Sequence, residues 1–167
     1  MNIRRLLLAV MSLLCSGLLT LPDAHAADLQ DAAALQGLHS AKGVFMIDVD
    51  NPGRVARVLE TIQTTDKSMS KQGVEPHIVV VVIGPTVAFL TKDRRGISYK
   101  DERAVSQIQT AIRKLNEMDI RTEACGVALK GMDIPPTELI PEVHPVGNGF
   151  ISAIGYQAQG YSLVPVY

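Results

Sequence analysis

The sequence predicts an α/β fold, a three-layer α/β/α sandwich with a mainly parallel sheet of about five strands. Continuous apolar runs of strand length, above all Val44–Val49 and Ile78–Ile83, are typical of strands that are covered on both faces. Segments with helical apolar spacing alternate with these runs along the chain. Such alternation indicates right-handed βαβ crossovers and therefore helices on both faces of one sheet.

The first half of the chain is expected to form helix, strand, helix and strand. A short leading helix falls within residues 27–43, an extension that precedes the domain proper at residues 44–167. After the first strand, Asn51–Pro52 fits the N-cap and first position of a helix that stops at Gly73. The apolar residues of this helix recur at the spacing of one buried face: Val55, Val58, Leu59 and Ile62.

The second half alternates in the same way. Gly84–Pro85 breaks the second strand, and a charged loop leads into the next helix. The buried stripe of that helix is expected at Val105, Ile108, Ile112 and Leu115. Further strands are expected at Ile120–Cys125, Val143–Val146 and Tyr161–Val166. Two helices lie between them, Gly126–Met132 and a helix capped by Asn148 that runs through Gln159 with Phe150, Ile151 and Ile154 turned inward.

The amino terminus has the three parts of a secretory signal peptide. Arg4-Arg5 precedes the apolar segment Leu6–Leu21, and Ala24-His25-Ala26 fits an A-x-A cleavage site. The apolar core is shorter than the ~20 residues that a spanning helix needs. We therefore expect residues 1–26 to be removed, leaving a mature chain that starts at Ala27, has no membrane span and is periplasmic.

Composition excludes several classes of function. The chain has 167 residues, 47% of them apolar, and a formal net charge of -1, which suits one ordinary globular domain. Because there is no broad basic field, nucleic-acid binding is not expected. The 4 His and 2 Cys are scattered, without the spacing of a zinc site, so neither a metal nor another cofactor is expected.

Cys125 is the first candidate for chemistry. It is the one cysteine that remains after the predicted cleavage, and an unpaired thiol in an oxidising compartment is buried, used or bonded to something else. Its predicted place is the junction of a strand and a helix, where backbone N–H groups and the helix dipole favour a thiolate. The alternative is a small buried residue that only packs.

Other candidates lie where the strands of an open α/β sheet present their carboxyl ends, which is where ligands bind. These rim positions are Asp48, Asp50, Gly84, Gly126, His144 and Asn148. Asp48 and Asp50 would share a face as acid and base or as cation ligands, or would serve only the helix dipole and solvent. His144 would approach Cys125 or be an ordinary surface residue. Gly147-Asn148-Gly149 indicates a tight turn more than a dinucleotide fingerprint, because it follows the fourth strand and lacks the third glycine.

In their order and spacing these segments resemble the DsrE/DsrF-like family. The resemblance spans Val44–Tyr167. The residues that carry it are Ile78–Ile83 with Gly84–Leu90, Glu123-Ala124-Cys125-Gly126, Leu139–Val146, and the glycine-bounded helix before Gly160-Tyr161. It implies a five-stranded sandwich that assembles as a homotrimer or homohexamer, in a superfamily that includes sulfur-relay proteins.

In such relay proteins a cysteine after the third strand carries sulfur as a persulfide, and Cys125 matches that position. The resemblance thus implies a sulfurtransferase or sulfur carrier with a sulfur donor or acceptor protein as partner. Those proteins are cytoplasmic and heteromeric, whereas this chain has the features of an exported one. The competing hypothesis is a noncatalytic homo-oligomeric module that binds a small ligand or a partner at the rim, with Cys125 only packed.

Contacts between copies are expected at apolar residues that fall outside the main helical stripes. These are Met69, Phe89, Leu90, Met118 and Met132. The alternative is that they fold back into the core of one chain.

Overall fold

The computed structural model describes residues 29–94 and 96–167. The predicted signal peptide and its cleavage site lie outside these residues. From Asp31 to Tyr167 the chain forms one unit. Within the described residues, no helix combines the length and the apolar character that crossing a membrane requires.

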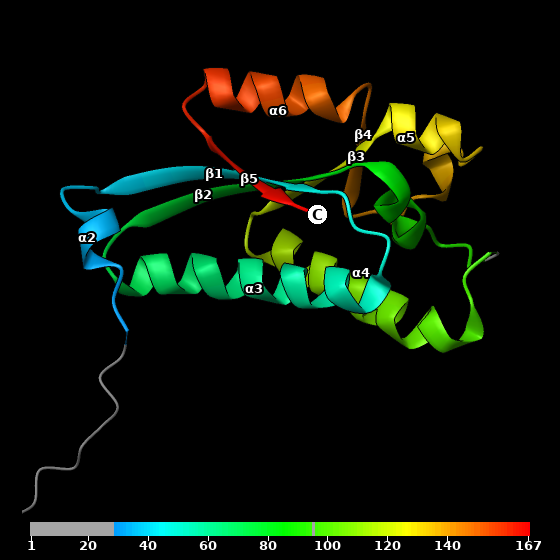
Figure 1. The fold of residues 1–167 in the computed structure, drawn as a ribbon, viewed down its shortest axis with the longest axis horizontal. Helices are drawn as coiled ribbons and strands as arrows, with labels where there is room; N and C mark the ends of the chain where they lie inside the picture. The colour runs from blue at the N-terminus through cyan, green and yellow to red at the C-terminus, as the bar shows by residue number, and fades with distance from the viewer. Residues whose placement is uncertain (1–28, 95) are drawn as a thin grey trace, which may run out of the picture. The chain divides into compact units, whose positions relative to one another are not determined.

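Five strands form one sheet in the order β4-β3-β2-β1-β5 (Figure 1). Their bounds are Ser40–Ile47 for β1, Glu75–Val82 for β2, Arg121–Cys125 for β3, Val143–Val146 for β4 and Ser162–Val166 for β5. Every pairing is parallel. The register aligns Val81 of β2 with Glu123 of β3, and Glu123 with His144 of β4. The predicted fold class is confirmed.

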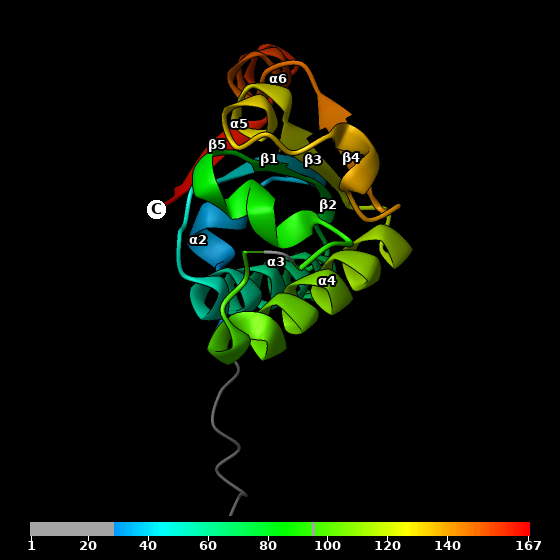
Figure 2. The same ribbon diagram turned by 90° about the vertical axis from the view of Figure 1, so that its right-hand side faces the viewer.

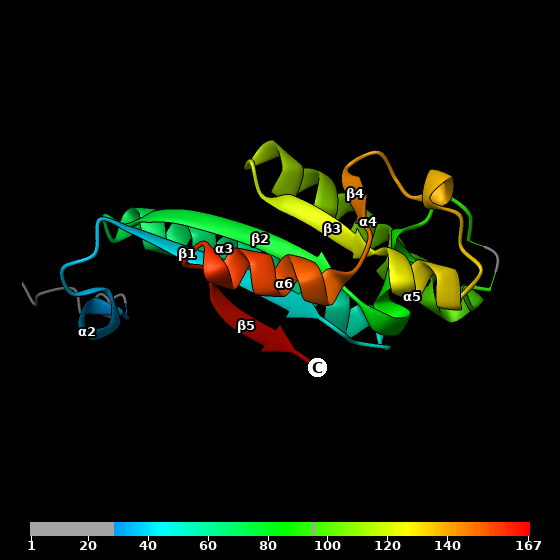
Figure 3. The same cartoon turned by 90° about the horizontal axis from the view of Figure 1, so that it is seen from above.

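Helices cover both faces of this sheet (Figure 2). One layer holds α3 (Pro52–Lys71) and α4 (Glu102–Glu117), and the other holds α5 (Gly126–Gly131) and α6 (Gly149–Ala158). The remaining helical segments are α2 (Ala32–Leu35), η2 (Gly84–Leu90), η3 (Tyr99–Asp101) and η4 (Pro136–Glu138). Figure 3 shows that α6 begins near the carboxyl ends of the strands and runs back across the sheet.

The larger hydrophobic core lies between the sheet and the layer of α3 and α4. The predicted stripe of α4 is fully buried there: Val105, Ile108, Ile112 and Leu115. The start of α3 is also as predicted, because the Asn51 Oδ1 atom accepts a hydrogen bond of 2.9 Å from the Arg54 N–H and Pro52 is the first helical residue.

The first strand begins earlier than predicted. The leading helix is reduced to the four residues of α2, none of them buried. The strand starts at Ser40 instead of Val44, because residues 40–43 pair with the beginning of β2. Pairing with an adjacent strand thus overrides the weak helical pattern of this segment.

The inward face of α6 was predicted wrongly. Phe150, Ile151 and Ile154 are 58%, 68% and 65% exposed, whereas Gly149 and Ala153 are buried. The small residues let the helix lie close to the sheet, and the large apolar residues then fall on the outer side.

The residues expected at contacts between copies are mostly part of the core. Phe89 and Leu90 are buried, and Met118 packs against the core cluster. Met69 is half-buried. Met132 alone of the five is exposed, at 44%.

Both edge strands contain an exposed proline, Pro145 in β4 and Pro165 in β5. Proline has no backbone N–H to donate to a further strand.

Candidate functional site

Cys125 is the last residue of β3 and the N-cap residue of α5. It is a free cysteine and only 5% exposed. Its side chain belongs to the smaller hydrophobic cluster, between the sheet and α6, together with Val44, Val79, Val81 and Ile83. Cys125 therefore lies at a junction of strand and helix, as predicted, and its thiol is buried.

One backbone donor reaches the sulfur. The Gly149 N–H donates a hydrogen bond to the Cys125 Sγ atom at 3.2 Å. Asn148 holds the start of α6 in place, since its Oδ1 atom accepts a hydrogen bond of 2.9 Å from the Phe150 N–H. A backbone N–H directed at sulfur supplies a hydrogen-bond donor to negative charge that develops there during a reaction.

Gly149 is required for this contact. A Cβ atom at this position would lie 2.6 Å from Ile83 Cγ2 and 3.2 Å from both Cys125 Cβ and Val81 Cγ1. Any larger residue would therefore move the first turn of α6 away from the sheet and from the sulfur.

A buried carboxylate lies on the same face of β3. Glu123 is 4% exposed and two residues before Cys125. Its Oε1 atom accepts hydrogen bonds from Arg121 Nε at 2.8 Å and from the Tyr156 hydroxyl of α6 at 2.9 Å. Its Oε2 atom is buried and has no hydrogen-bond partner among the described residues.

This arrangement affects the titration of Tyr156. Burial, followed by the hydrogen bond to Glu123 and the charge of that carboxylate, raises the pKa of Tyr156 from 10.0 to about 12. The Tyr156 ring also contacts the Tyr161 ring edge-on at 5.1 Å between centroids, and Lys42 Nζ lies 5.5 Å from the Tyr161 centroid. The phenol is thus fixed as a donor to Glu123 over the ordinary range of pH.

His144 lies on β4, the strand next to the one that ends at Cys125. In the register of the sheet, His144 is opposite Glu123, and the residue opposite Cys125 is Val146. His144 is half-buried, and no hydrogen bond joins it to Cys125 among the described residues. Glu142, next to the same edge strand, is half-buried and has an Oε2 atom without a hydrogen-bond partner within the described part of the chain.

The two aspartates of the rim are separated. Asp48 extends β1 by one residue, since its N–H donates to the Val166 carbonyl at 2.9 Å. Its half-buried carboxylate lies against Gly84, where a Cβ atom would collide with Asp48 Oδ1. Asp50 is exposed further along the loop, and in residues 29–94 and 96–167 no interaction joins the two carboxylates.

The loop between these aspartates is held by Thr86. The Thr86 Oγ1 atom accepts a hydrogen bond from the Val49 N–H and donates one to the Val49 carbonyl, both at 2.7 Å. Thr86 is fully buried, so the ends of β1 and β2 are tied together within the core.

Gly126 completes the immediate surroundings of the sulfur. It opens α5 directly after Cys125, and a Cβ atom there would lie 2.7 Å from the Val146 carbonyl oxygen. The structure therefore brings Cys125, Gly126 and the Asn148–Gly149 turn together at the carboxyl ends of β3 and β4. Among the described residues, no group of three or more His, Cys, Asp or Glu side chains could hold a metal ion.

Sequence reasoning missed the participation of Glu123 and Tyr156. Glu123 is a charged residue within a buried strand, which was a usable signal, and Arg121 stands two residues earlier on the same face. Tyr156 is 33 residues away from Glu123, and nothing in the local pattern connects them.

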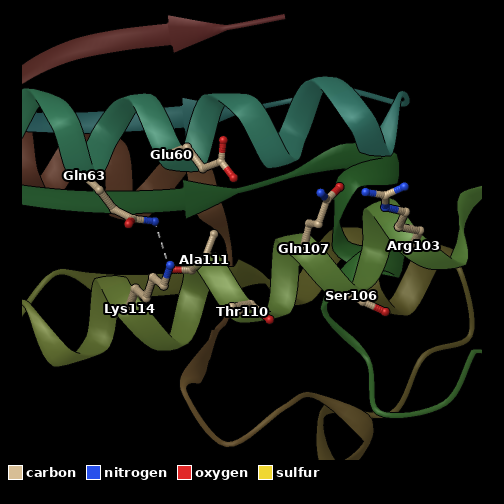
Figure 4. Close-up of a pocket in the computed structure, with 8 residues that line it drawn as sticks. All are labelled: Glu60, Gln63, Arg103, Ser106, Gln107, Thr110, Ala111 and Lys114. Carbon is tan, nitrogen blue, oxygen red and sulfur yellow. Dashed lines mark hydrogen bonds between the residues drawn. The ribbon is translucent and has the colours of Figure 1, made fainter.

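The opposite layer contains a pocket of about 230 Å³ between α3 and α4 (Figure 4). Across it, the Gln63 Nε2 atom of α3 donates to the Ala111 carbonyl of α4 at 3.4 Å. The remaining lining residues are polar or charged: Glu60, Arg103, Ser106, Gln107, Thr110 and Lys114. Because α3 and α4 lie on the other face of the sheet, this pocket is separate from the surroundings of Cys125.

Comparisons with known proteins agree with this description. The model of the DsrE/DsrF-like family matches residues 28–166. A solved structure of a protein of unknown function, MTH1491 from Methanobacterium thermoautotrophicum, is similar with a TM-score of 0.59 and 20% identity, covering 75% of this chain and 98% of that one. The ychN protein from E. coli is similar with a TM-score of 0.49 and 14% identity, covering 76% and 99%. A comparison with curated protein sequences finds no match. At these identities, the similarity of the structures concerns the fold alone.

Proposed function

Because the chain belongs to the DsrE/DsrF-like family, whose fold is related to sulfur relay, we propose that it handles sulfane sulfur through a persulfide on Cys125. The observation that carries the proposal is the Gly149 N–H at 3.2 Å from the Cys125 Sγ atom. A donor held at this position stabilises negative charge on the sulfur during the exchange. The protein would act as a sulfurtransferase or as a sulfur carrier between a donor and an acceptor protein.

The exchange requires no external oxidant or reductant. The Cys125 thiolate attacks the terminal sulfur of a donor persulfide, R–S–SH, and forms a new S–S bond while the S–S bond of the donor breaks. The donor leaves as R–S⁻, and Cys125 becomes Cys125–S–SH. Attack on the outer sulfur by an acceptor thiolate then reverses these roles and regenerates the Cys125 thiolate.

The test is intact-mass spectrometry after incubation with polysulfide or thiosulfate. The expected result is a mass increase of one sulfur atom that dithiothreitol removes and that Cys125→Ser lacks. No adduct with either donor, together with a folded Cys125 that resists alkylation, would exclude persulfide chemistry. Peptide mapping assigns the adduct, since trypsin releases Cys125 within residues 122–130.

We also propose that the protein is periplasmic and works as a homotrimer or homohexamer. The signal-peptide pattern of residues 1–26 supports export, and amino-terminal sequencing of exported protein is expected to start at Ala27. The exposed apolar residues of α6 and α5 support self-association: Phe150, Ile151, Ile154 and Val127.

Light scattering after size exclusion tests the assembly. An oligomer is expected for the wild type, and Ile151→Asp is expected to shift it towards the mass of one chain. A wild type that elutes as one chain at all micromolar concentrations would exclude the assembly.

A noncatalytic binding module is the second candidate function. It is favoured by the burial of Cys125, which is 5% exposed and packed in an apolar cluster. In a deletion strain, a folded Cys125→Ser protein that restores the wild-type effect would favour binding. Loss of the effect with the fold preserved would favour sulfur transfer.

A further inference from the structure

We propose that the buried ion pair of Arg121 and Glu123 makes Cys125 selective for uncharged or cationic sulfur donors, and that it disfavours anionic donors such as thiosulfate. The inference rests on the proposed function, since it concerns the class of donor that Cys125 would accept.

The order of charges along β3 is the starting point. Arg121, Glu123 and Cys125 occupy alternate positions and therefore project from one face of the strand. At ~3.3 Å per residue, the Cα atom of Glu123 lies about 7 Å and that of Arg121 about 13 Å along the strand from Cys125. The Arg121 Nε atom extends towards Cys125 as far as the Glu123 Oε1 atom, at 2.8 Å from it. Along the strand, the negative residue of the ion pair is thus the nearer one to Cys125.

Burial limits the screening of the electrostatic field of the Glu123 carboxylate. The Glu123 side chain is 5% exposed, whereas that of Arg121 is 45% exposed, so solvent and salt screen the cation more than the carboxylate. Both donors to Glu123 reach the Oε1 atom, and the buried Oε2 atom has no hydrogen-bond partner among the described residues. Both donors therefore act on one oxygen of the carboxylate, and its other oxygen is left without a donor in the described part of the chain.

The other charged groups at this end and face of the sheet do not reverse the negative sign of the electrostatic potential at Cys125. Asp48 directly follows β1 at the carboxyl edge of the sheet, where it adds a second carboxylate. His144 stands opposite Glu123 at the edge of the sheet. Lys130 of α5 is exposed, and Lys42 lies against Tyr161, the residue that precedes β5 at the amino-terminal side of the sheet. The Glu123 carboxylate is therefore better shielded from water than any of these cations.

The consequence is a charge filter on the incoming donor. A dianion such as thiosulfate is repelled through both of its charges, whereas a neutral hydropersulfide is not. The Gly149 N–H acts on the Cys125 sulfur itself and stabilises it equally for every donor. At about 7 Å and an effective dielectric constant of about 20, one unpaired charge changes the rate on the order of tenfold or more per unit of donor charge. The Arg121 guanidinium offsets part of this in the wild type, and the full effect of one charge is expected when Glu123 is neutralised.

Methanethiosulfonates of similar size and opposite charge measure this filter directly. The Cys125 thiolate displaces methanesulfinate from either the sulfonatoethyl (anionic) or the trimethylammonioethyl (cationic) reagent and forms a mixed disulfide. The rate for each reagent is followed on the tryptic peptide that contains Cys125, which is residues 122–130, or 115–130 in Arg121→Gln, and which separates Cys125 from Cys15. The ratio of the cationic to the anionic rate is then compared between the folded chain and the chain in urea.

Three variants define the expected pattern. The ratio should be higher in the folded wild type than in urea, should fall at least tenfold in Glu123→Gln and should rise in Arg121→Gln. Opposite changes from the two ends of one ion pair do not arise from general loosening of the fold. Glu60→Gln makes the same chemical change on the other layer of the sheet, at an exposed position, and should leave the ratio unchanged.

Two results would overturn the inference, and they are distinguishable. If Cys125 reacts but the ratio is the same in wild type, Glu123→Gln and Arg121→Gln, the filter is absent while sulfur transfer stays open. If Cys125 reacts with neither reagent nor with neutral methyl methanethiosulfonate, both the filter and the proposed function are wrong. A hydropersulfide that transfers sulfur faster than thiosulfate, with the difference reduced in Glu123→Gln, would support both.

Discussion

The contact between α6 and Cys125 is expected to depend on the missing side chain of Gly149. In Gly149→Ala, the new Cβ atom would lie 2.6 Å from Ile83 Cγ2, where carbon atoms normally approach to ~3.5–4.0 Å. The first turn of α6 must therefore move outward by about 1 Å. Overpacking of this kind lowers the free energy of unfolding by about 1–3 kcal/mol. The better helix propensity of alanine offsets less than about 1 kcal/mol of this loss.

We therefore expect Gly149→Ala to lower the free energy of unfolding by about 1–2 kcal/mol. Urea unfolding followed by circular dichroism at one fixed protein concentration measures it as a lower midpoint with an unchanged slope. The displacement also lengthens the 3.2 Å contact between the Gly149 nitrogen and the Cys125 sulfur, so the alkylation rate of Cys125 should change as well.

Gly155→Ala is the matched control in the same helix. A Cβ atom there meets nothing within 4 Å, so alanine should stabilise the protein by about 0.5–1 kcal/mol. If Gly149→Ala proved as stable as the wild type, the close approach of α6 to the sheet would not be the reason for the glycine.

Three further substitutions address single contacts. Tyr156→Phe removes the 2.9 Å hydrogen bond to Glu123 and should cost about 1–2 kcal/mol in urea unfolding at pH 7. Because the folded pKa of Tyr156 is raised from 10.0 to about 12, wild-type stability should fall as pH rises from 10 towards 12, and Tyr156→Phe should lack that part of the fall. Thr86→Val leaves the buried N–H and carbonyl of Val49 without partners and should cost about 2–4 kcal/mol in the same assay. Burial raises the pKa of Asp66, so its charged form is disfavoured in the fold, and Asp66→Asn should raise the melting temperature at pH 7 but not near pH 3.

Each of these three has an outcome that would contradict it. Thr64→Val, on the exposed face of α3, is the control for Thr86→Val and should stay within about 0.5 kcal/mol of wild type. Equal losses of unfolding free energy in Thr86→Val and Thr64→Val would show that the two hydrogen bonds between Thr86 and Val49 contribute nothing to stability. An unchanged alkaline slope in Tyr156→Phe, or a lower melting temperature of Asp66→Asn at pH 7, would mean that the causes assigned to those pKa values are wrong.

The parts of the fold that the sequence predicted well are those in which large apolar residues decide burial. The apolar stripe of α4 and the apolar run of β2 can each be buried in only one way, because no other face of the segment is apolar enough to be covered. α6 is different, since its small residues Gly149 and Ala153 pack inward and its large ones face out. Hydrophobicity alone favours the large residues, and the choice is made by how closely the helix approaches the sheet.

The candidate site was predicted in part. Cys125 and its place after β3 followed from the alternation of strands and helices. Contacts between distant segments did not: the register that puts Glu123 beside His144, and the hydroxyl that Tyr156 brings from α6, both depend on the assembled sheet. The early start of β1 has the same origin, because residues 40–43 are drawn into a strand by β2 and not by their own propensity.

The prolines of the two edge strands limit how this protein can meet other copies of itself. With Pro145 at one margin of the sheet and Pro165 at the other, neither margin offers an uninterrupted ladder of donors to an added strand. Runaway growth by strand addition, the route to fibrils, is therefore hindered at both ends. Contacts between copies are thereby directed to the helical faces, where a closed symmetric assembly is the usual outcome of contacts between identical chains.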